Sequence, residues 1–474
     1  MSDLGTAARP LRVAIVGSGP SGFYAAEALH KAEDVTVQVD MFDRLPTPFG
    51  LVRLGVAPDH PKIKSVTRVY DKIAEHPEFR FFGNVEVGRD ISLHDIRHYY
   101  HAIIYAVGAP SDRRLGIPGE HLPGSHSATE FVGWYNAHPD FRSLGFRMEG
   151  SRAVVVGNGN VAMDVTRILA LPDDELAQTD IADHALETLA GRNVTEIVML
   201  GRRGPAQAAF TTKELKELLE IPGVDVIVDP ADLELDEATR AHIDAGEDRN
   251  RDSNLKVLRE MAEREPTGAP VRIVLRFLVS PVEVLGDERV TGVVLERNTL
   301  VADPDGGSPR ARAAEGAPRE TLECDLVFRA IGYRGTAIPG LPFDGRSACI
   351  PNRAGRVIDP AADGAPLAGE YVTGWIKRGP QGIIGTNKPD SVETVGSLLE
   401  DWRAGALERP VPPRQVLETL VAERRGDHVS YDDWRVLDGI ETRRGADGGR
   451  PRQKFSRIEE MLRALEEHKE TVSS

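Results

Sequence analysis

The sequence predicts an α/β fold that contains two nucleotide-binding units. The prediction rests on one pattern that occurs twice: an apolar strand, a glycine-rich turn, a helix and a second strand. In the first copy the strand covers residues 11–16, the helix 21–31 and the second strand 35–42. The second copy begins with a strand at 152–156 that also runs into a glycine turn. Two copies of this Rossmann-like pattern indicate two domains, each able to bind one nucleotide.

The remaining elements are less regular. The apolar runs at 271–285 and 290–301 predict strands of an antiparallel element, and the Gly/Pro/Ala-rich stretch at 302–319 is expected to be its exposed loop. Residues 226–265 are acidic and helix-prone, and the charged tail beyond residue 403 has no clear functional signal. Further strands are expected at 102–107, 196–200, 325–331 and 371–373, and helices at about 162–171, within 173–190 and from about Pro389.

Length, charge and cysteine content exclude several classes of protein. A chain of 474 residues is too long for one ordinary hydrophobic core, so two or three domains are expected. The two cysteines, Cys324 and Cys349, are too few for a disulfide framework or a four-cysteine iron–sulfur cluster and form no paired-cysteine redox motif. The net charge of −16 argues against nucleic acid as a partner. With no apolar span and no signal-peptide core, a soluble cytoplasmic protein is expected, and no metal site is predicted.

The first turn, residues 17–22, has the residues that a dinucleotide diphosphate requires. Gly17 permits the sharp turn from strand to helix, Gly19 lets the diphosphate approach the backbone, and Gly22 lets the helix pack close to the strand. The helix N-terminus offers N–H groups and a partial positive charge to phosphates. Asp43 follows Gly22 by 21 residues, close to the interval of about 20 at which a carboxylate binds ribose hydroxyls. The turn therefore predicts a nucleotide site.

The second turn differs from the first at the end of the following strand. Its third glycine is replaced by Ala162, which is an allowed variant. Arg202 and Arg203 stand where the first unit has its acid. An acid there would repel a 2′-phosphate, whereas guanidinium groups bind it in fork geometry. The alternative is that both arginines are solvated surface charges, but their position directly after a buried strand favours a site for NADP(H) over one for NAD(H).

Two nucleotide sites require two cofactors. One is a nicotinamide nucleotide by the argument above. A tightly held flavin is its usual companion, because a flavin links hydride chemistry to one-electron chemistry. Since the second turn carries the arginines, the first turn is left for FAD, with Asp43 at its ribose.

Several longer runs of residues are recognisable. They lie at 45–53 (LPTPFGLVR), 55–62 (GVAPDHPK), 131–136 (FVGWYN), 201–205 (GRRGP), 374–380 (GWIKRGP) and 385–387 (GTN). In these runs the chain resembles the adrenodoxin reductase-type ferredoxin–NADP⁺ reductases, and most closely their actinobacterial members. The resemblance extends from about residue 11 to about residue 400 and is weaker in the tail.

The resemblance implies an architecture and a set of partners. The fold is that of the glutathione reductase-like flavoproteins, with two Rossmann-like domains in three layers, β/β/α or α/β/α. Residues 1–112 and 345–474 would form a discontinuous FAD-binding domain, and residues 113–344 an inserted NADP-binding domain. NADPH would be the electron donor, FAD the non-covalent cofactor, and a ferredoxin-type iron–sulfur protein the acceptor.

The resemblance also assigns residues to each cofactor. Members of the family can have Glu at the position of Asp43, so the ribose contact is expected to shift without losing its role. The residues expected to contact FAD are Gly17, Gly19, Pro20, Ser21, Gly22, Asp43, Leu51, Val87, Trp375, Gly382, Ile383 and Ile384. The residues expected to contact NADP(H) are Arg113, Asn158, Gly159, Asn160, Val161, Arg202, Arg203, Glu214 and Gly382.

His60 and Glu217 match the polar pair that the family has near the flavin and the nicotinamide. From the residues alone each has a plainer interpretation, because a histidine between prolines commonly packs in a loop and Glu217 lies beside lysines on a helix. Hydride transfer needs positioning and no proton relay at carbon. We therefore expect both residues to orient the nicotinamide and to act electrostatically.

The predicted function is that of an NADPH:ferredoxin oxidoreductase. NADPH would give a hydride to FAD, and single electrons would then pass to the iron–sulfur protein, with the reverse direction equally allowed. Two alternatives stay open: a general NADPH diaphorase, and a non-catalytic sensor or scaffold that binds FAD and NADP. A disulfide reductase would need a paired-cysteine motif, and an electron-input subunit of the glutamate synthase type a cysteine-rich segment; the sequence has neither.

The acceptor is expected to dock on a local basic patch of a monomeric protein. Ferredoxins are generally acidic, and the net charge of −16 repels them at long range. The candidates for this patch are Lys62, Lys64, Arg68, Arg113, Arg114, Lys377 and Arg378.

Overall fold

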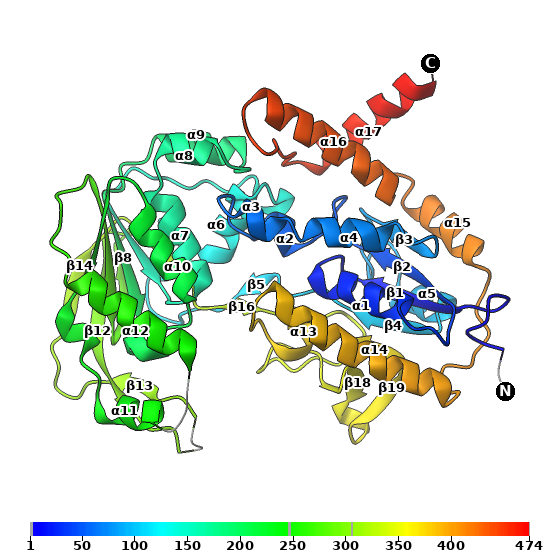
Figure 1. Ribbon diagram of the computed structural model, residues 1–474, viewed down its shortest axis with the longest axis horizontal. Helices are drawn as coiled ribbons and strands as arrows, with labels where there is room; N and C mark the ends of the chain where they lie inside the picture. The colour runs from blue at the N-terminus through cyan, green and yellow to red at the C-terminus, as the bar shows by residue number, and fades with distance from the viewer. Residues whose placement is uncertain (1–2, 245–247, 305–306, 474) are drawn as a thin grey trace. The chain divides into compact units, whose positions relative to one another are not determined.

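The chain folds into two compact units. Unit 1 comprises residues 1–111, 136–139 and 333–474, and unit 2 comprises residues 112–135 and 140–332. The computed structural model, drawn in Figure 1, describes residues 3–244, 248–304 and 307–473.

The boundaries of the units differ from those expected in two places: residues 136–139 belong to unit 1, and the return from unit 2 is early. The chain enters unit 2 at 111–112, next to the expected boundary, but it returns to unit 1 at 332–333 instead of 344–345. The return is early because Ile338 and Phe343 already pack against the hydrophobic core of unit 1.

The centre of unit 1 is a seven-stranded sheet with the strand order β17-β18-β19-β4-β1-β2-β3. The interior strand β1 pairs in parallel with β2 and β4. All residues of β1 are buried, because both faces of the sheet are covered, and this explains the unbroken apolar run in the sequence. The strands are β1 (Leu11–Val16), β2 (Val37–Phe42), β3 (Phe79–Phe82), β4 (Ala102–Tyr105), β17 (Asn352–Arg353), β18 (Arg356–Asp359) and β19 (Ala365–Val372).

Helices cover both faces of this sheet. On one face α1 and α14 lie side by side, and α4, α16 and α17 add to the same core (Figure 1). On the other face α5 and α15 supply the apolar side chains. The helices are α1 (Pro20–His30), α2 (Leu51–Leu54), α3 (Pro61–Lys64), α4 (Thr67–Ala74), α5 (Leu93–Tyr99), α13 (Trp375–Arg378), α14 (Asn387–Arg403), α15 (Arg414–Arg424), α16 (Tyr431–Asp447) and α17 (Ile458–Ser473).

The tail beyond residue 403 completes unit 1. Glu441 on α16 is fully buried and accepts hydrogen bonds of 2.5 and 2.8 Å from Arg53 on α2. Arg452 Nη1 and the N–H of Phe455 also donate to it, at 2.9 and 2.8 Å. Burial alone would raise the pKa of Glu441, but Arg53 and Arg452 hold that pKa below its ordinary value. The tail therefore anchors α2.

Unit 2 is built on a six-stranded parallel sheet with the order β6-β15-β7-β8-β10-β9. A second, antiparallel sheet of β11 to β14 contributes apolar residues to a shared core, and α7 packs on β7, β8 and β10. The strands are β6 (Ser125–Ser127), β7 (Arg152–Val156), β8 (Glu196–Gly201), β9 (Val224–Val228), β10 (Val271–Phe277), β11 (Val279–Leu285), β12 (Gly292–Val301), β13 (Arg310–Ala313), β14 (Glu320–Glu323) and β15 (Leu326–Arg329).

The helices of unit 2 lie mainly in its first two thirds. They are α6 (Ala128–Tyr135), α7 (Asn160–Ala170), α8 (Asp173–Ala177), α9 (Asp183–Ala190), α10 (Thr212–Glu217), α11 (Glu237–Asp244) and α12 (Arg249–Ala262). Two short strands, β5 (Ser111–Asp112) and β16 (Tyr333–Arg334), lie where the chain changes unit.

Three parts of unit 2 differ from the sequence prediction. β10 pairs in parallel with β8 and β9, so it belongs to the main sheet and not to the antiparallel element. The stretch at 302–319 is not a loop throughout, because β13 pairs with β12. Residues 226–228, expected in a helix-prone region, belong to β9. In the last two cases pairing with a neighbouring strand overrides a weak local preference, whereas for β10 only the pairing partner differs.

Candidate functional site

The first glycine turn lies at the carboxyl end of β1. Gly17 has a φ of +108°, and a Cβ atom there would overlap the carbonyl oxygen of Ala106. A Cβ at Gly22 would overlap the carbonyl oxygen of Gly17, so α1 approaches β1 closely. The Cβ position of Gly19 has no neighbour within 4 Å in the described part of the chain, and no described side chain caps α1. The backbone is therefore open to a diphosphate at the N-terminus of α1.

Asp43 lies directly after β2 and faces this turn. Its Oδ2 accepts hydrogen bonds from the N–H and the hydroxyl group of Ser18, at 3.0 and 2.5 Å, and its Oδ1 accepts one from the N–H of Leu45 at 2.9 Å. A carboxylate has about four acceptor positions, so capacity for a ribose hydroxyl is left. The structure brings the acid to the turn, and its contact with ribose stays a prediction.

The segment that leads into α2 also lies against the turn. The N–H of Phe49 donates to the carbonyl oxygen of Ser18 at 2.9 Å, and a Cβ at Gly50 would lie 3.0 Å from the Cα of Gly19. Leu51 begins α2 directly after this contact and is half-buried. The segment thus places Leu51 beside the predicted FAD turn.

Other predicted FAD contacts come from separate parts of unit 1. Val87 is half-buried and packs against the core on the face of α5. Gly382 has a φ of +82°, and the N–H of Ile383 donates to the hydroxyl group of Thr386 at 3.1 Å. A 3-10 turn (Ile384–Thr386) then leads into α14. The side chain of Ile383 is 64% exposed, which leaves an apolar surface beside the N-terminus of α14.

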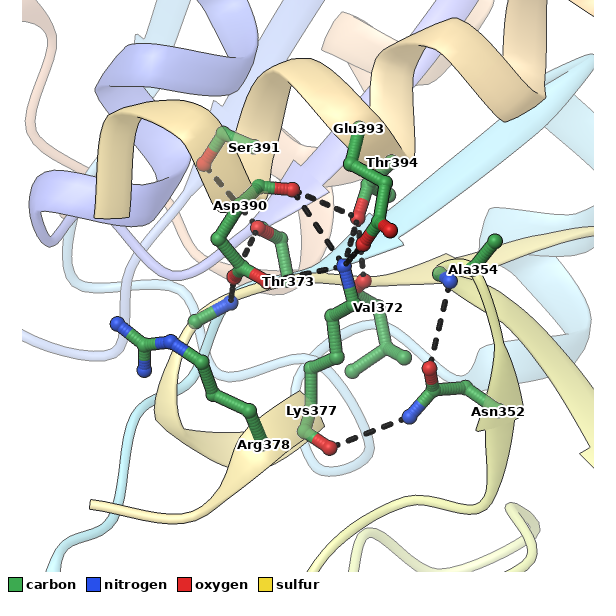
Figure 2. A network of polar contacts seen from close by, with 12 residues as sticks. Asn352, Ala354, Val372, Thr373, Lys377, Arg378, Asp390, Ser391, Glu393 and Thr394 are labelled. Atoms are coloured by element: carbon green, nitrogen blue, oxygen red, sulfur yellow. Dashed lines mark hydrogen bonds and ion pairs between the residues drawn. The ribbon is translucent and has the colours of Figure 1, made fainter. Parts of the chain in front are cut away.

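Asp390 is a residue of this region that the sequence does not reveal (Figure 2). From the first turn of α14, its Oδ2 accepts hydrogen bonds from the N–H of Gly374 at 2.5 Å and the hydroxyl group of Thr373 at 3.1 Å. An acid in the first turn of a helix is its only sequence signal, and that signal is common to many helices. The carboxylate fixes the end of β19 where Trp375 begins α13.

Lys377 and Arg378 follow one another in α13 but point in different directions (Figure 2). Nζ of Lys377 lies 2.9 Å from Asp390 Oδ1 and 2.5 Å from Glu393 Oε2, and 7% of its side chain is exposed. Arg378 donates through Nη2 to Asn387 Oδ1 at 2.9 Å. The prediction that these two residues belong to a docking patch is therefore wrong, because both charged groups are turned into unit 1.

Trp375 packs on Tyr333, with the ring centroids 5.2 Å apart. Its indole Nε1 is buried and has no hydrogen-bond partner within the described residues. A buried indole N–H normally donates to an acceptor. This orphan donor fits a site that a bound group completes.

The second turn joins β7 to α7 in unit 2. No described side chain caps α7, and the Cβ position of Gly159 has its nearest neighbour at 4.0 Å. Oδ1 of Asn160 accepts from the N–H of Thr211 at 2.9 Å, which ties the turn to α10. Nδ2 of Asn158 is buried without a hydrogen-bond partner among the described residues. Half-buried Val161 follows in the first turn of α7, so this turn is also open to a ligand.

Arg202 and Arg203 lie directly after β8. Arg202 is exposed and Arg203 is half-buried, with Nη1 donating to Ser308 Oγ at 3.2 Å. Burial and the like charge of Arg202 lower the pKa of Arg203. Within the described residues neither guanidinium forms an ion pair with a carboxylate. Two uncompensated positive charges at this strand end fit a phosphate ligand.

Glu214 and Arg113 occupy different surroundings in unit 2. Glu214 is 6% exposed, and its Oε2 accepts from Arg167 Nη1 at 2.9 Å. Arg113 is exposed, and its N–H donates to the carbonyl oxygen of Gly332 at 3.0 Å. The predicted contacts of both with NADP(H) stay predictions.

His60 and Glu217 belong to different units. His60 is 8% exposed and is the N-cap of α3. Glu217 ends α10, and its carboxylate lies 3.2 Å from Lys213 Nζ and 3.9 Å from Arg167 Nη1. Glu217 is therefore held between two cations and is not a fully solvated helix charge. The predicted place of both residues near the flavin and the nicotinamide stays a prediction.

These features define a class of protein. Each unit offers a glycine turn at an uncapped helix N-terminus, a buried N–H donor without a protein partner, and a charged group at the end of the second strand of its βαβ unit. The donors fit FAD in unit 1 and a phosphorylated nicotinamide nucleotide in unit 2. The fold and the sites are those of a two-nucleotide flavoprotein oxidoreductase. In agreement, the family model described as pyridine nucleotide-disulphide oxidoreductase matches residues 11–231.

Similar proteins narrow this class. The chain is 51% identical over 465 residues to NADPH-ferredoxin reductase FprA of Mycobacterium tuberculosis, covering 96% of this chain and 99% of the relative. It is 41% identical over 465 residues to the mitochondrial NADPH:adrenodoxin oxidoreductase of Arabidopsis thaliana, covering 96% and 95%. The solved structure of Mycobacterium tuberculosis FprA in complex with NADPH matches with a TM-score of 0.90 and 49% identity, covering 96% of this chain and 100% of the other.

The chain belongs to the NADPH–ferredoxin reductase family. It is an oxidoreductase whose cofactors are FAD and NADP(H). The fold class, the family resemblance and the two cofactors expected from the sequence are confirmed. In the described part of the chain no helix is both long and apolar enough to cross a membrane.

Proposed function

We propose that the protein transfers electrons between NADPH and a ferredoxin-type iron–sulfur protein, with FAD bound in unit 1 and NADPH in unit 2. Bound FAD supplies the chemistry that joins the partners, because a flavin accepts a hydride and releases electrons singly. The observation that carries the proposal is the inversion of charge between equivalent strand ends, with Asp43 in unit 1 and Arg202 and Arg203 in unit 2. The names of the similar reductases support it.

In unit 1 the backbone does most of the binding. The N–H groups at the N-terminus of α1 would hold the FAD diphosphate, and Asp43 would accept from a ribose hydroxyl. The tight turn at Gly382 would present the N-terminus of α14 to the pyrimidine edge of the flavin, where its partial positive charge stabilises added negative charge. Leu51, Ile383 and Trp375 would supply apolar contacts.

In unit 2 the side chains select the nucleotide. Arg202 and Arg203 would bind the 2′-phosphate, and the buried amide of Asn158 would donate to the bound nucleotide. Asn160, bonded to Thr211, would keep the turn in register with α10. Arg113 and Glu214 would complete this site.

His60 and Glu217 would orient the nicotinamide. Hydride transfer gains most from holding the two reacting atoms in line, which buried or paired side chains do better than solvated ones. The buried His60 and the doubly paired Glu217 have the restricted freedom that this role needs. Neither has to move a proton for the hydride to transfer.

The acceptor would dock on the exposed face of α3 and α4. Lys62 of α3 and Arg68 of α4 are exposed, and Val69, the residue after Arg68, has a side chain that is 41% exposed. Exposed cations together with an exposed apolar residue suit an acidic ferredoxin. We expect Arg68→Glu to raise the KM for ferredoxin severalfold, more at low salt, without changing NADPH–ferricyanide activity. Arg463→Glu on α17 is the charge-matched control, and an equal effect of both would exclude this face.

The decisive experiment is NADPH-dependent cytochrome c reduction with and without candidate ferredoxins, repeated with NADH. We expect strong stimulation by at least one ferredoxin and a marked preference for NADPH. Activity without stimulation by any ferredoxin would instead favour a general NADPH diaphorase. A bound flavin that NADPH does not bleach without oxygen would favour a non-catalytic sensor or scaffold.

Two finer expectations accompany the proposal. A monomer is expected, and analytical ultracentrifugation of the flavin-loaded protein tests it. A cytoplasmic location is also expected, and fractionation of the cells that make the protein tests it.

A further inference from the structure

Arg378 has two buried N–H positions that nothing in the described chain accepts. Nη2 donates to Asn387 Oδ1 at 2.9 Å, whereas Nε and Nη1 are buried without a hydrogen-bond partner among the described residues. The adjacent Lys377 differs, because its single ammonium group is paired with Asp390 and Glu393 (Figure 2). Of these two neighbouring cations, Lys377 therefore has its ion-pair partners within the protein, whereas Arg378 lacks acceptors for two of its N–H groups.

Such an arrangement is costly in a protein that binds nothing there. A buried donor without an acceptor costs about 1–3 kcal/mol, and more when the group is charged. Native proteins rarely leave such groups, and the exceptions commonly mark a ligand or a functional site. No described carboxylate neutralises the guanidinium of Arg378 either. The missing partner is therefore expected to be an acceptor that carries negative charge.

The surroundings of Arg378 connect it to the first glycine turn. Asn387 Oδ1, which accepts from Arg378, also accepts from Ser21 Oγ at 3.0 Å. Ser21 belongs to the turn itself, and Ser391 Oγ donates to its carbonyl oxygen at 2.9 Å. A Cβ at Gly374 would overlap Ser21 Oγ, so the start of α13 lies directly on the turn. One amide thus separates the guanidinium from the residues predicted to bind FAD.

We propose that Arg378 binds an anionic oxygen of FAD through Nε and Nη1. The inference rests on the proposed binding of FAD by unit 1. FAD offers two kinds of anionic oxygen: those of the diphosphate, which are charged in both redox states, and the pyrimidine oxygen, which gains negative charge when the flavin is reduced. Arg378 is then a cofactor-binding residue of the electron-transfer site and not part of the ferredoxin surface.

The two kinds of oxygen predict different measurements. A contact with the diphosphate stabilises oxidised and reduced FAD equally, so Arg378→Gln should weaken FAD binding at least tenfold and leave the midpoint potential unchanged. A contact with the pyrimidine oxygen stabilises the reduced flavin selectively. Arg378→Gln should then lower the two-electron midpoint potential by about 30 mV for each tenfold loss of that selectivity.

The test uses the flavin-loaded enzyme. FAD dissociation is followed by the rise in flavin fluorescence on dilution, and the midpoint potential by spectroelectrochemistry. Lys388→Gln is the matched control: it removes a cation from the residue next to Asn387, but its ammonium is half-exposed and paired with Glu27 at 3.0 Å. We expect Lys388→Gln to change neither quantity.

Unchanged FAD affinity and unchanged potential in Arg378→Gln would overturn the proposal. So would a selective loss of ferredoxin-dependent activity, which would return Arg378 to the docking surface. If circular dichroism shows that Arg378→Gln does not fold, Arg378→Lys decides, because lysine keeps the charge but has no planar donor at Nε; wild-type affinity and potential in that variant overturn the proposal. A wild-type enzyme without flavin would count against the proposed function itself.

Discussion

The two glycine turns share one backbone arrangement but tolerate different residues at the third position. The third position of the turn is Gly22 in unit 1, where a Cβ would overlap the carbonyl oxygen of Gly17. In unit 2 the third position is Ala162, whose side chain is completely buried without displacing the turn. The residue at the third position therefore depends on how closely the helix approaches its strand, whereas the second glycine, Gly19 or Gly159, leaves the backbone of each turn open.

The charged residues after the second strand of each unit also differ in how the fold uses them. Asp43 is bonded to Ser18 and Leu45, so it helps to hold the turn even before a ribose is present. Arg202 and Arg203 form no ion pair in the described chain. Unit 1 therefore uses its acid as a structural hydrogen-bond acceptor, whereas the arginines of unit 2 have no carboxylate partner among the described residues.

The largest expected effect comes from substitutions at the third position of each turn, Gly22 and Ala162. Gly22→Ala should abolish stable FAD binding, because the added Cβ has to displace α1 or the backbone of Gly17. The reciprocal change Ala162→Gly should cost only about 1 kcal/mol, the ordinary helix penalty of glycine. Flavin absorbance per protein and the unfolding midpoint measure both variants. Full flavin content in Gly22→Ala would show that the close approach is not required.

The second effect tests how the tail supports unit 1. Glu441→Gln leaves Arg53 buried without its charged partner, and breaking a buried pair in this way costs about 3–5 kcal/mol. We expect unit 1 to release flavin at lower urea concentrations. Glu418→Gln is the control, because the side chain of Glu418 is 58% exposed in its pair with Arg80.

The same pair gives a pH dependence with a definite sign. Burial alone would raise the pKa of Glu441, but Arg53 and Arg452 lower it in the folded protein. The ionised Glu441 therefore contributes fully to the free energy of unfolding above the unfolded pKa of about 4.3, and this contribution is lost as the pH falls through the lower folded pKa. The stability difference between wild type and Glu441→Gln should shrink as the pH is lowered below about 4.3. A difference that grew on acidification would contradict this assignment.

The third effect concerns the arginines of unit 2. Arg202→Ala should raise the KM for NADPH about 10- to 100-fold, because one or two charge-assisted hydrogen bonds are lost. The KM for NADH should stay nearly unchanged. Steady-state ferricyanide reduction with each nucleotide measures the ratio. Equal effects on both nucleotides would mean that Arg202 does not recognise the 2′-phosphate.

The smallest effect concerns the acid of unit 1. Asp43→Asn keeps the shape but removes the charge, so FAD affinity should fall about tenfold while the KM for NADPH stays unchanged. Asp43→Glu, which keeps the carboxylate, should retain most of the affinity. A change in NADPH binding in either variant would contradict the assignment of FAD to unit 1 and NADPH to unit 2.

The sequence predicts those parts of the molecule that rest on local patterns. Gly17, Gly22 and Asp43 follow a fixed spacing, and each lies where that spacing requires. The parallel strands beside them are equally recognisable, because both of their faces are buried. Edge elements such as β13 were not predictable, since pairing with β12 decides their structure.

Residues that act across long stretches of sequence have no local signal. Asp390 reaches Gly374 from a different element, and Glu441 reaches Arg53 across 388 residues. From the sequence Arg378 resembles a surface cation, because its neighbours Lys377 and Gly379 give no sign that its side chain points inward. Only the packing of α13 against α14 and the first turn determines where its guanidinium lies.

The discontinuous construction of unit 1 has a consequence for synthesis on the ribosome. β19 pairs with β4, yet the whole of unit 2 is translated between them. During that interval β4 is the edge of an incomplete sheet, and such edges are templates for aggregation. Unit 2, nearly contiguous in sequence, is free to fold first. We therefore expect flavin loading to be a late step of biogenesis, because β19, α14 and α16 of unit 1 are all translated after unit 2.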